Sequence, residues 1–579
     1  MDDDVVRSQA VIDCDLAIVG SGAAGLSAAV TAAANGLRVH VFEKASVLGG
    51  TTAWSGGWIF APRNPVARRA GIHELFEAPF RYLSDVLDGH FDEARVKAFL
   101  IHAPRMVEFF ENETELQFEG GNHIPDTYGE VPGAGTGGRS VIAAPFDARQ
   151  LGRHIGLLRR PLPETTFLGM TIQAGPDLRA FMTMARSWPA FKYVARRFSA
   201  HLRDLAFHGR GMELRNGNAL IARLLLSALR LNVTFHAGTS ARRLLIEGGQ
   251  TNGVIVASRT GEIIVKAMRG VVLASGGFSQ NADLCRRYFP AAEHHHPLAI
   301  PETVGDGCRM AEEIGASFDD TLASPAAWCP VSLVPWPDGR QGVFPHIIDR
   351  GKPGIIAVTR DGRRFCNEAM GYHDFVTDLL AATPAGQVPE SWLICTRAFQ
   401  RRYGLGISRP SPVPYRSWVK RGYLVEARTT EELAAACGID PQGLAATIKY
   451  WNRHARQGQD PAFGRGSTPY QRLQGDPDNK PNPCVAPIEQ GPFLALRVVP
   501  GSFGCFAGIR TDDHARVLDT AGRVIPGLFS AGTDSANVMG GYYPAGGINI
   551  GPAMTFGYIA GRTAADLPHQ EDIDIAADN

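Results

Sequence analysis

The sequence lacks the features that mark several classes of protein. Its 58 basic side chains (Lys and Arg) are balanced by 58 acidic ones (Asp and Glu), so no overall field attracts nucleic acid. No apolar run approaches the roughly 18 residues of a membrane-spanning helix, and the first residues are acidic where a signal peptide would be basic. We therefore predict a cytoplasmic protein that does not bind nucleic acid.

Cysteine is sparse and scattered. The nine cysteines form no C-x-x-C pair and no iron–sulfur cluster spacing, which favours buried thiols in a reducing compartment. His294, His295 and His296 are consecutive, so they do not share one face, and no carboxylate follows at ligand spacing. We expect no metal site. At 579 residues the chain has room for roughly three or four domains, or for two large ones.

Glycine, in contrast, is abundant and stands at informative positions near the start. The apolar run 16–19 meets Gly20, Gly22 and Gly25 in G-x-G-x-x-G spacing, and the Ala-rich segment that follows predicts a helix. Gly20 permits a tight turn, Gly22 lets the backbone approach a pyrophosphate, and Gly25 lets the helix pack on the strand. The pattern predicts a dinucleotide site, with Ala24 at the helix N-terminus.

A second predicted strand, 38–44, leads into a polar loop. It ends on Glu43, whose carboxylate can accept the ribose hydroxyls of an adenosine. The residues of this strand end and loop that we expect at a flat, polar ring system are Lys44, Gly50, Thr51, Thr52, Ser55, Gly56 and Gly57. The segment resembles the FAD-binding part of the fumarate reductase/succinate dehydrogenase flavoprotein superfamily. Members with covalent flavin carry a His in this loop, and this chain has none before His73, so the resemblance implies non-covalent FAD.

Two later Gly-rich segments predict a second contribution to the flavin site. A buried strand near residues 270–274 leads through Ala274 to Gly276. Another apolar strand ends at Gly532, and a Gly-rich turn then opens a helix at Asn549 and Ile550. The N-terminus of that helix can face the flavin pyrimidine.

The stretch from about residue 285 to residue 484 has no second phosphate loop and mixes predicted short strands with helices. We therefore predict an α/β fold in which a Rossmann-like FAD-binding domain, residues 1–284 and 490–579, carries an inserted α+β substrate domain, residues 285–489. Within the insertion we expect a strand, a hairpin turn at Asp361 and Gly362, and a second strand.

Three other segments deserve an interpretation: one predicts helices, and each of the other two fits two alternatives. Residues 79–114 place apolar side chains at helical spacing and predict structural helices. The Gly- and Pro-rich segment 120–147 fits either an exposed functional loop or a folded pocket wall. Residues 176–210 carry basic side chains among apolar ones, which fits a solvated helical face or a patch in weak contact with a membrane surface.

Nearly the whole chain resembles the FAD-dependent 3-ketosteroid Δ1-dehydrogenase family. The match is strongest at the glycine motif of residues 20–25, at "PDTYGEVPGAGTGGR", at "GRRFCNEAMGYHDF" and at "YYPAGGINIGPAMTFGYIAGR". The resemblance implies that Tyr543 and Gly547 hold the substrate ketone, that Tyr372 is the base and that Tyr128 assists it. The chain departs from the family's usual Y-P-G-P-G at Ala545 and Gly546 and has Asn549 where Thr is usual, so the substrate is expected to be a 3-ketosteroid or another small apolar cyclic ketone.

These residue types suit dehydrogenation beside a ketone. The reaction needs a group that stabilises the developing enolate, a base for the more acidic hydrogen and an acceptor for the hydride. Tyr543 and Gly547 would serve the first need, Tyr372 the second and flavin N5 the third, with a quinone-like external electron acceptor. A tyrosine has an ordinary pKa of about 10, so Tyr372 needs help, for which Tyr128 is the candidate. His373 is the next candidate base.

Two other functions stay open. Fumarate-type enzymes carry an H-G-x-x-R-L-G-G pattern near the C-terminal flavin segment, because a dicarboxylate needs cationic donors. This chain reads "MGGYYPAGG" there, with neither Arg nor His, yet reduction of an unsaturated dicarboxylate is the second hypothesis. A non-catalytic flavin sensor or scaffold is the third.

Overall fold

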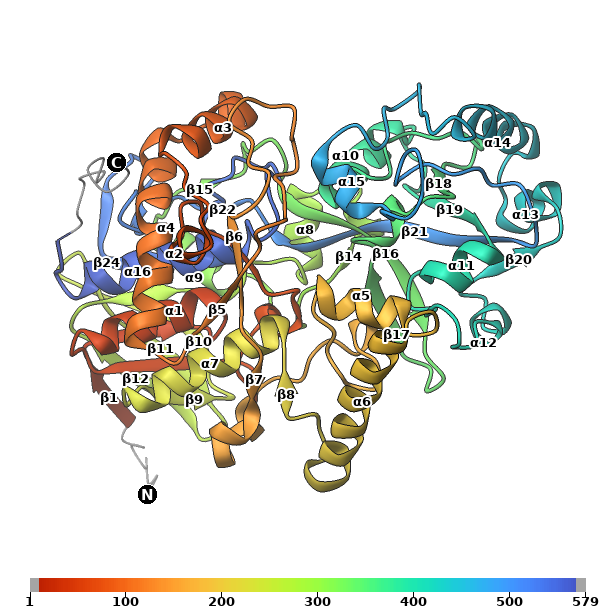
Figure 1. The fold of residues 1–579 in the computed structure, drawn as a ribbon. Coiled ribbons are helices and arrows are strands. Elements are labelled where there is room, and N and C mark those ends of the chain that lie inside the picture. The colour runs from red at the N-terminus through yellow and green to blue at the C-terminus, as the bar shows by residue number, and fades with distance from the viewer. Residues whose placement is uncertain (1–9, 569–579) are drawn as a thin grey trace, which may run out of the picture.

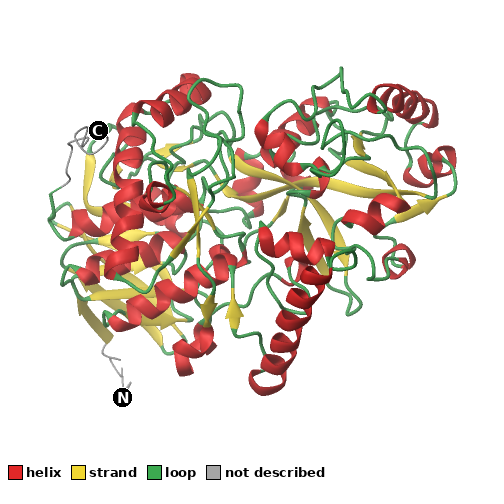
Figure 2. Cartoon of the chain, viewed as in Figure 1, coloured by secondary structure: helices red, strands yellow, loops and turns green. Residues whose placement is uncertain are grey.

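The computed structural model describes residues 10–568, which form two lobes joined side by side (Figure 1). Helices lie around the strands in both lobes (Figure 2). Both described ends of the chain lie in the lobe that contains the first glycine motif (Figure 1). The predicted α/β class, with a Rossmann-like unit and an inserted α+β unit, is confirmed.

The first lobe is built on a six-stranded sheet in which every neighbouring pair is parallel except β23 with β24. In sheet order its strands are β23 (Arg516–Leu518), β24 (Val524–Ser530), β13 (Val271–Leu273), β2 (Leu16–Val19), β3 (Val39–Glu43) and β9 (Thr234–Ala237). Strands β2 and β13 are buried throughout. A parallel strand that is covered on both faces reads as a continuous apolar run, which is why these segments were recognisable in the sequence.

Small residues set the packing on the sheet. Helix α1 (Ala23–Ala34) packs against α16 (Ile550–Ala564). A Cβ at Gly557 would lie 2.4 Å from the Ala24 carbonyl oxygen, and one at Gly561 would lie 2.8 Å from that of Ala28. Only glycine allows the two helix backbones to come this close.

A four-stranded sheet lies beside the six-stranded one, in the order β1 (Ala10–Cys14), β12 (Gly261–Ala267), β11 (Gln250–Ser258) and β10 (Ser240–Glu247). Three small sheets complete the strand pairing: β4 (Trp58–Phe60) with β6 (Ser140–Ala143) and β5 (Phe118–Gly120), β7 (Phe146–Asp147) with β8 (Glu213–Leu214), and β15 (Phe318–Asp319) with β22 (Gly508–Ile509). The remaining helices before the second lobe are α2 (Pro65–Arg69), α3 (Glu77–Leu87), α4 (Glu93–Glu113), α5 (Pro176–Thr183), α6 (Trp188–His208), α7 (Asn216–Arg230), α8 (Ala282–Tyr288) and α9 (Asp306–Glu312).

The second lobe holds a seven-stranded sheet whose long central strand is β21 (Phe493–Cys505). Its other strands are β14 (His296–Pro297), β16 (Ala326–Pro335), β17 (Gln341–Pro345), β18 (Ile355–Val358), β19 (Ser391–Thr396) and β20 (Val425–Ala427). Its helices are α10 (Tyr372–Ala382), α11 (Arg397–Tyr403), α12 (Arg416–Lys420), α13 (Thr430–Cys437), α14 (Pro441–Ala455) and α15 (Pro469–Gln474). The proposed domain limits stay a prediction. Strand β21 lies beyond residue 489, the predicted end of the inserted domain. It nevertheless belongs to the second lobe, because it pairs with β16, β19 and β20.

The prediction of a second strand after the turn at residues 361–362 is wrong. The turn forms, since the Gly362 N–H bonds the Thr359 carbonyl oxygen at 2.9 Å, but the chain then runs as a loop into α10. The carboxylate of Glu368 takes the place of a strand partner by accepting the Ala357 N–H at 3.0 Å.

Glu368 is also the centre of a buried ion cluster that anchors α10. Its carboxylate bonds the guanidinium of Arg364 at 2.6 Å and that of Arg465 at 3.1 Å. The Glu368 and Arg465 side chains are both fully shielded from solvent. The two guanidinium groups hold the pKa of Glu368 below its usual value although burial alone would raise it.

None of the helices within residues 10–568 combines the length and the apolar character needed to cross a membrane.

We predict that Glu368→Gln lowers the free energy of unfolding by about 3–5 kcal/mol, because it leaves two guanidinium groups facing a neutral amide in the interior. Urea denaturation followed by tryptophan fluorescence measures this. The matched control is Glu313→Gln, which breaks an exposed i,i+4 pair with Arg309 and is expected to change stability little. Equal stability of the Glu368 variant and the parent would contradict a structural role for the cluster.

Candidate active site

Residues 543–547 occupy a fixed position where the two lobes meet. Five hydrogen bonds to their carbonyl oxygens hold them, and the donors come from separate parts of the first lobe. These bonds are Thr127 N–H to Pro544 (2.8 Å), the Tyr82 hydroxyl to Pro544 (2.6 Å), the Ser140 hydroxyl to Gly546 (2.9 Å), Phe60 N–H to Gly547 (3.1 Å) and Gly551 N–H to Gly547 (2.8 Å). The segment is therefore preorganised.

Gly547 combines a conformation that favours glycine with a free donor. Its φ is +99°, and a Cβ there would lie 2.6 Å from the backbone nitrogen of Phe60. Its amide N–H has no hydrogen-bond partner within residues 10–568. An unpaired N–H on a half-buried residue suits the oxygen of a ketone or enolate.

Tyr372 and Tyr543 come together from the two lobes. Tyr372 is the first residue of α10, and its ring meets that of Tyr543 edge-on, with 4.8 Å between the ring centroids. The two hydroxyls are close enough to affect each other's pKa, and the Asn549 amide donates to the Tyr543 oxygen at 3.2 Å. Burial raises the pKa of both phenols, so both are neutral in this arrangement.

Tyr128 lies on a folded wall rather than on an exposed loop. The segment 120–139 is tied down by Asp126, which accepts the Gly135 N–H at 2.8 Å and pairs with Arg139. The Tyr128 hydroxyl donates to Asp374 Oδ1 at 2.8 Å, and the nearby backbone N–H of Tyr543 lowers the pKa of Tyr128, which burial raises. Of the two sequence-based alternatives for this segment, the structure favours a folded, partly buried wall over an exposed loop, and its place at a pocket stays a prediction.

His373 is poorly suited to act as a base. Its Nδ1 accepts the Trp328 N–H at 3.2 Å, so the proton of the neutral ring is on Nε2. Burial lowers the pKa of His373 to about 3, which keeps the ring neutral at physiological pH. With one nitrogen engaged and the other protonated, the ring offers no free lone pair to a substrate.

An apolar wall adjoins the tyrosine pair. Tyr372 and Phe503 pack with a cluster of the second lobe in which Cys329, Val331 and Val499 are buried. The partly exposed members of the cluster include Trp54, Leu333, Val343 and Ile347. Such a lining suits an apolar ligand with few polar groups.

The glycine motif forms a cradle at the N-terminus of α1. Gly22 faces Gly50, and a Cβ at Gly22 would meet only the Thr52 hydroxyl, at 3.8 Å. The amide N–H groups of Gly22 and Gly50 have no partner in the part of the chain that the structure describes, and the Thr52 hydroxyl accepts the Ala23 N–H at 3.2 Å. Open space, unpaired N–H groups and a helix N-terminus together fit a pyrophosphate.

Comparisons with known proteins agree with this geometry. Residues 15–550 match the family described as FAD binding domain. A 4-oxocyclohex-2-ene-1-carboxylate 5-dehydrogenase of Sinomonas cyclohexanicum is 39% identical, over 97% of this chain and 95% of its own length. A 3-oxosteroid 1-dehydrogenase of Mycobacterium tuberculosis is 35% identical, over 96% of this chain and 99% of its own length. The chain belongs to this family of FAD-dependent dehydrogenases.

A solved structure supports the same assignment. The 3-ketosteroid Δ1-dehydrogenase of Sterolibacterium denitrificans, in complex with 1,4-androstadiene-3,17-dione, superposes with a TM-score of 0.88 at 33% identity. The match covers 96% of this chain and 99% of that chain. This member of the family is therefore an FAD-dependent oxidoreductase that acts on CH–CH bonds and dehydrogenates cyclic ketones.

The other residues proposed for FAD lie in three groups, and their roles stay predictions. Ala24 faces Gly532, 3.0 Å from the position of a Cβ there, which brings the α1 N-terminus and the end of β24 together. Asn549 and Ile550 begin α16 beside them, and the Asn549 Oδ1 atom is buried without a partner within residues 10–568. That oxygen suits a donor on a ligand.

The adenosine end is more occupied than the sequence suggested. Glu43 Oε2 accepts the N–H and hydroxyl of Ser21 at 3.1 and 2.6 Å, and Oε1 accepts the Ala45 N–H at 2.9 Å. A carboxylate has about four acceptor positions, so one remains for a ribose hydroxyl instead of the two expected. Lys44 pairs with Asp306 at 2.8 Å.

The remaining members of the loop mainly shape the backbone. The Thr51 hydroxyl accepts the Ile300 N–H at 3.2 Å, and Ser55 donates to the Thr52 carbonyl at 2.7 Å. Side chains at two further glycines would collide with neighbours, Gly57 with the Asn216 backbone at 2.5 Å and Gly276 with Thr303 at 2.9 Å, whereas Gly56 is open. Ala274 continues β13 through a 2.9 Å bond to the Val19 carbonyl.

The sequence drew attention to Asp374 without giving it a role, and it gave no sign of Tyr470. Tyr470 raises the pKa of Tyr372 and of Tyr543, and burial raises its own pKa to about 12. Asp374 stands two residues after the proposed base, but nothing in its spacing marked it as the partner of Tyr128. Both contacts join segments that are far apart in the chain.

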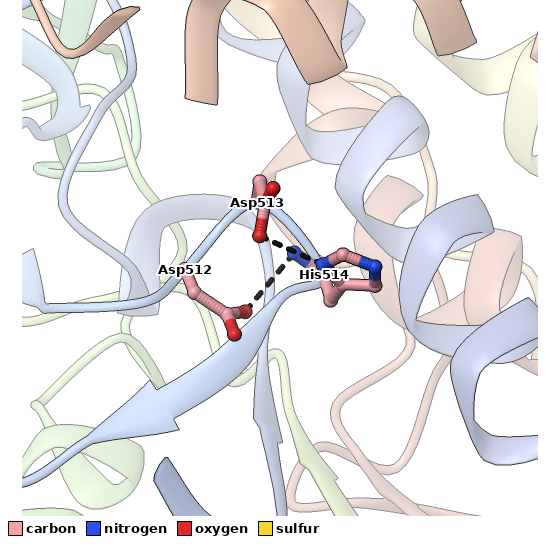
Figure 3. Close-up of side chains that lie close together, drawn as sticks. All are labelled: Asp512, Asp513 and His514. Carbon is pink, nitrogen blue, oxygen red and sulfur yellow. Dashed lines mark hydrogen bonds and ion pairs between the residues drawn. The ribbon is translucent and has the colours of Figure 1, made fainter. Parts of the chain in front are cut away.

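A possible metal-ligand group occurs before β23, at a site that the sequence did not suggest. Asp512, Asp513 and His514 offer ligand atoms within 4.8 Å of one another (Figure 3). The turn already uses them, since Asp512 accepts the His514 N–H at 3.0 Å and Asp513 bonds the ring of His514 at 2.7 Å. Elsewhere, His295 bonds the Ser502 hydroxyl at 2.8 Å. The absence of a metal site stays a prediction.

We predict that Gly22→Val abolishes FAD retention, because the side chain would fill the space of the pyrophosphate. The flavin-to-protein ratio after desalting, read from the visible absorbance, measures this. Gly89→Val is the control, since a Cβ at Gly89 meets nothing within 4 Å, and it should keep its flavin. Full flavin retention by the Gly22 variant would refute the cradle.

Proposed function

We propose that the chain introduces a C=C bond next to the carbonyl of a 3-ketosteroid or another apolar cyclic ketone. The observation that carries this proposal is the contact of Tyr372 with Tyr543 beside an apolar wall, in a segment that also holds the unpaired Gly547 N–H. Bound FAD supplies the hydride acceptor, at its N5. All other steps belong to residues of this chain.

The ketone oxygen is held by Tyr543 and Gly547. Asn549 fixes the Tyr543 oxygen, and the clamp on residues 543–547 fixes the N–H of Gly547. These two donors stabilise the enolate that develops as the α-carbon loses its proton. Binding of the ketone also takes the Tyr543 hydroxyl from Tyr372, so Tyr372 becomes available to the α-hydrogen.

Tyr372 removes the proton. In the free protein its pKa is raised by burial, so the phenol must lose its own proton before it can act. Tyr128 assists from the neighbouring wall, and its hydroxyl is directed toward the Asp374 carboxylate. Dehydrogenation thus requires an exit for one proton as well as one for a hydride.

One relative is named for a cyclohexene carboxylate and another for a steroid, so experiment must decide which ring system this chain oxidises. The apolar cluster supports a ligand with little charge. Reduction of an unsaturated dicarboxylate has less support, because residues 543–547 offer neither Arg nor His to bind a second carboxylate. Initial rates with a 3-ketosteroid and with fumarate, each with an artificial dye as the partner in electron transfer, separate the two.

We predict different losses in two tyrosine variants. Tyr372→Phe should bind the ketone as the parent does but lose roughly 10²–10⁴-fold in rate, because the phenyl ring fills the space without accepting a proton. Tyr543→Phe should weaken both binding and rate, and losing one oxyanion donor costs about 3–4 kcal/mol in the transition state. Stopped-flow bleaching of the flavin absorbance at a series of ketone concentrations gives both the dissociation constant of the ketone and the rate constant of flavin reduction.

The control for this pair is Tyr450→Phe, at an exposed tyrosine of α14, which should behave as the parent. If Tyr372→Phe reduces its flavin at the parent rate, the base lies elsewhere.

We also propose a quinone-like electron acceptor and weak binding of the protein to a membrane surface through α6. The apolar side chains of Trp188, Phe191, Leu202 and Phe207 are 65, 42, 46 and 79% exposed. The helix extends away from the body of the second lobe (Figure 1). An apolar substrate and a quinone would both be concentrated in a lipid phase.

The charges on this segment favour an anionic surface. Both acidic residues between Pro176 and His208 are buried in ion pairs, Asp177 with Arg197 and Asp204 with Arg149. Its exposed charged side chains are all basic, namely Arg179, Arg186, Lys192, Arg196 and Arg203. Basic and aromatic residues on one helix are typical of interfacial binding.

We predict that the protein sediments with vesicles of phosphatidylglycerol and phosphatidylcholine but not with phosphatidylcholine alone. The triple variant Lys192→Glu, Arg196→Glu, Arg203→Glu should bind on the order of 10²-fold more weakly, since each basic residue contributes about 1 kcal/mol at an anionic surface. The matched control reverses Arg242, Arg243 and Lys266, which are exposed on the first lobe. Equal sedimentation of both triple variants would exclude α6 as the contact.

A further inference from the structure

Asp374 is a buried carboxylate that the roles assigned so far leave unexplained. It lies in the first turn of α10, two residues after Tyr372. Its Oδ1 accepts the Tyr128 hydroxyl at 2.8 Å. Its Oδ2 is buried and has no hydrogen-bond partner within residues 10–568. An ionised carboxylate with one orphan oxygen is costly in the interior, so a structural role alone accounts poorly for this residue.

The surroundings of Asp374 do little to stabilise its charge. The titratable and charged groups that face it are Tyr82 of α3, Tyr128, Arg350 before β18, Asp378 of α10 and Tyr470 of α15. Arg350 is already committed to the carbonyl oxygens of His346, Glu368 and Met370, and Asp378 repels a second negative charge. Burial first, and Asp378 after it, raise the pKa of Asp374 to about 7. The group can therefore both take up and release a proton near neutrality.

Tyr128 connects this carboxylate with the reacting tyrosines. Its hydroxyl is close enough to the Tyr543 backbone N–H for that group to lower its pKa, and Tyr128 and Tyr372 both pack against the hydrophobic cluster that includes Tyr543. The phenol that donates to Asp374 is thus a neighbour of the pair that holds and attacks the ketone.

We propose that Asp374 is the terminal acceptor of the proton that the reaction removes from the ketone, and that the Tyr128 hydroxyl conducts the proton to it. The inference rests on the proposed function and extends it. Asp374 itself touches Tyr128 and not the substrate, so it is a positioning and proton-storing residue rather than a catalytic one.

The step transfers protons only. Tyr128 gives its hydroxyl proton to the Asp374 carboxylate and receives the phenolic proton of Tyr372, which becomes a phenolate. The phenolate then takes the α-proton of the ketone. At the end Tyr128 and Tyr372 are neutral phenols again, Asp374 is a neutral carboxylic acid, and the second hydrogen has left as hydride to bound FAD. Asp374 must release its proton to solvent before the next turnover.

The pH dependence follows from this cycle. Only the ionised carboxylate can accept a proton, and a raised pKa means that this form is lost as the pH falls. We therefore predict that kcat/KM rises with pH and levels off above about pH 7. Asp374→Asn keeps an acceptor for the Tyr128 hydroxyl but cannot be protonated. It should lose roughly 10²-fold or more in rate, with unchanged ketone binding, and lose this ionisation from the pH profile.

Two variants and one matched control make the test specific. Asp374→Glu should restore the ionisation and part of the rate. Tyr128→Phe should show the same loss as Asp374→Asn, and the double variant should be no slower than either single one, because both interrupt one path. The control is Asp378→Asn, an exposed acid on the same helix, which should keep the ionisation but move it to lower pH, because the repulsion that raises the pKa of Asp374 is removed.

A readout without turnover separates this inference from the proposed function. In infrared difference spectra of the FAD-loaded protein, the band of a protonated carboxylic acid should appear as the pH falls through about 7 and be missing in Asp374→Asn. A parent protein that oxidises no cyclic ketone would refute the proposed function whatever this band does. An active parent whose Asp374→Asn variant keeps its rate and pH profile would overturn the inference. So would a variant that is slower with an unchanged profile, since that loss is structural.

Discussion

The constraint on which the site depends is the clamp that holds residues 543–547 by their carbonyl oxygens. Its donors belong to β4, α3, the wall around Thr127, β6 and α16, so one short segment is bound to five separate parts of the first lobe. The clamp uses the carbonyl oxygens of Pro544, Gly546 and Gly547, and the Gly547 N–H has no partner within residues 10–568. The same clamp sets the ring of Tyr543 where Tyr372 of the other lobe can reach it. Preorganised donors of this kind cost no rearrangement when charge develops.

In the second lobe, buried charged side chains hold Tyr372 in position. Tyr372 is the first residue of α10, and the loop before that helix is fixed by Glu368 between two arginines. Such clusters are expensive to desolvate, and their contribution lies in geometry more than in net stability. The proposed base on one lobe and the proposed oxyanion donors on the other are thereby each held in place before a ligand arrives.

Burial has opposite consequences for the two halves of the proposed reaction. It strengthens the hydrogen bonds that stabilise an enolate, because the surroundings compete little with them. It also raises the pKa of Tyr372, which makes that phenol a reluctant base. A buried site that removes protons therefore needs an internal acceptor, and Asp374, whose pKa the same burial raises to about 7, meets that need through Tyr128.

The sequence by itself determined the features that depend on neighbours along the chain. The strand, turn and helix around Gly20, Gly22 and Gly25 were predictable because the spacing of small and apolar residues encodes them locally, and the α/β class and FAD followed from that unit. Motif resemblance brought Tyr372 and Tyr543 forward, and the structure places them together.

Only the tertiary structure decided the contacts between distant segments. It replaced the expected strand after Gly362 by a side-chain contact from Glu368, and it gave β21 to the second lobe because its hydrogen-bond partners lie there. It also occupied most of Glu43 with Ser21 and Ala45, and joined Tyr128 to Asp374 across 246 residues of chain. Spacing along a chain carries no record of such pairs, because burial and hydrogen bonding between distant residues exist only once the lobes have folded.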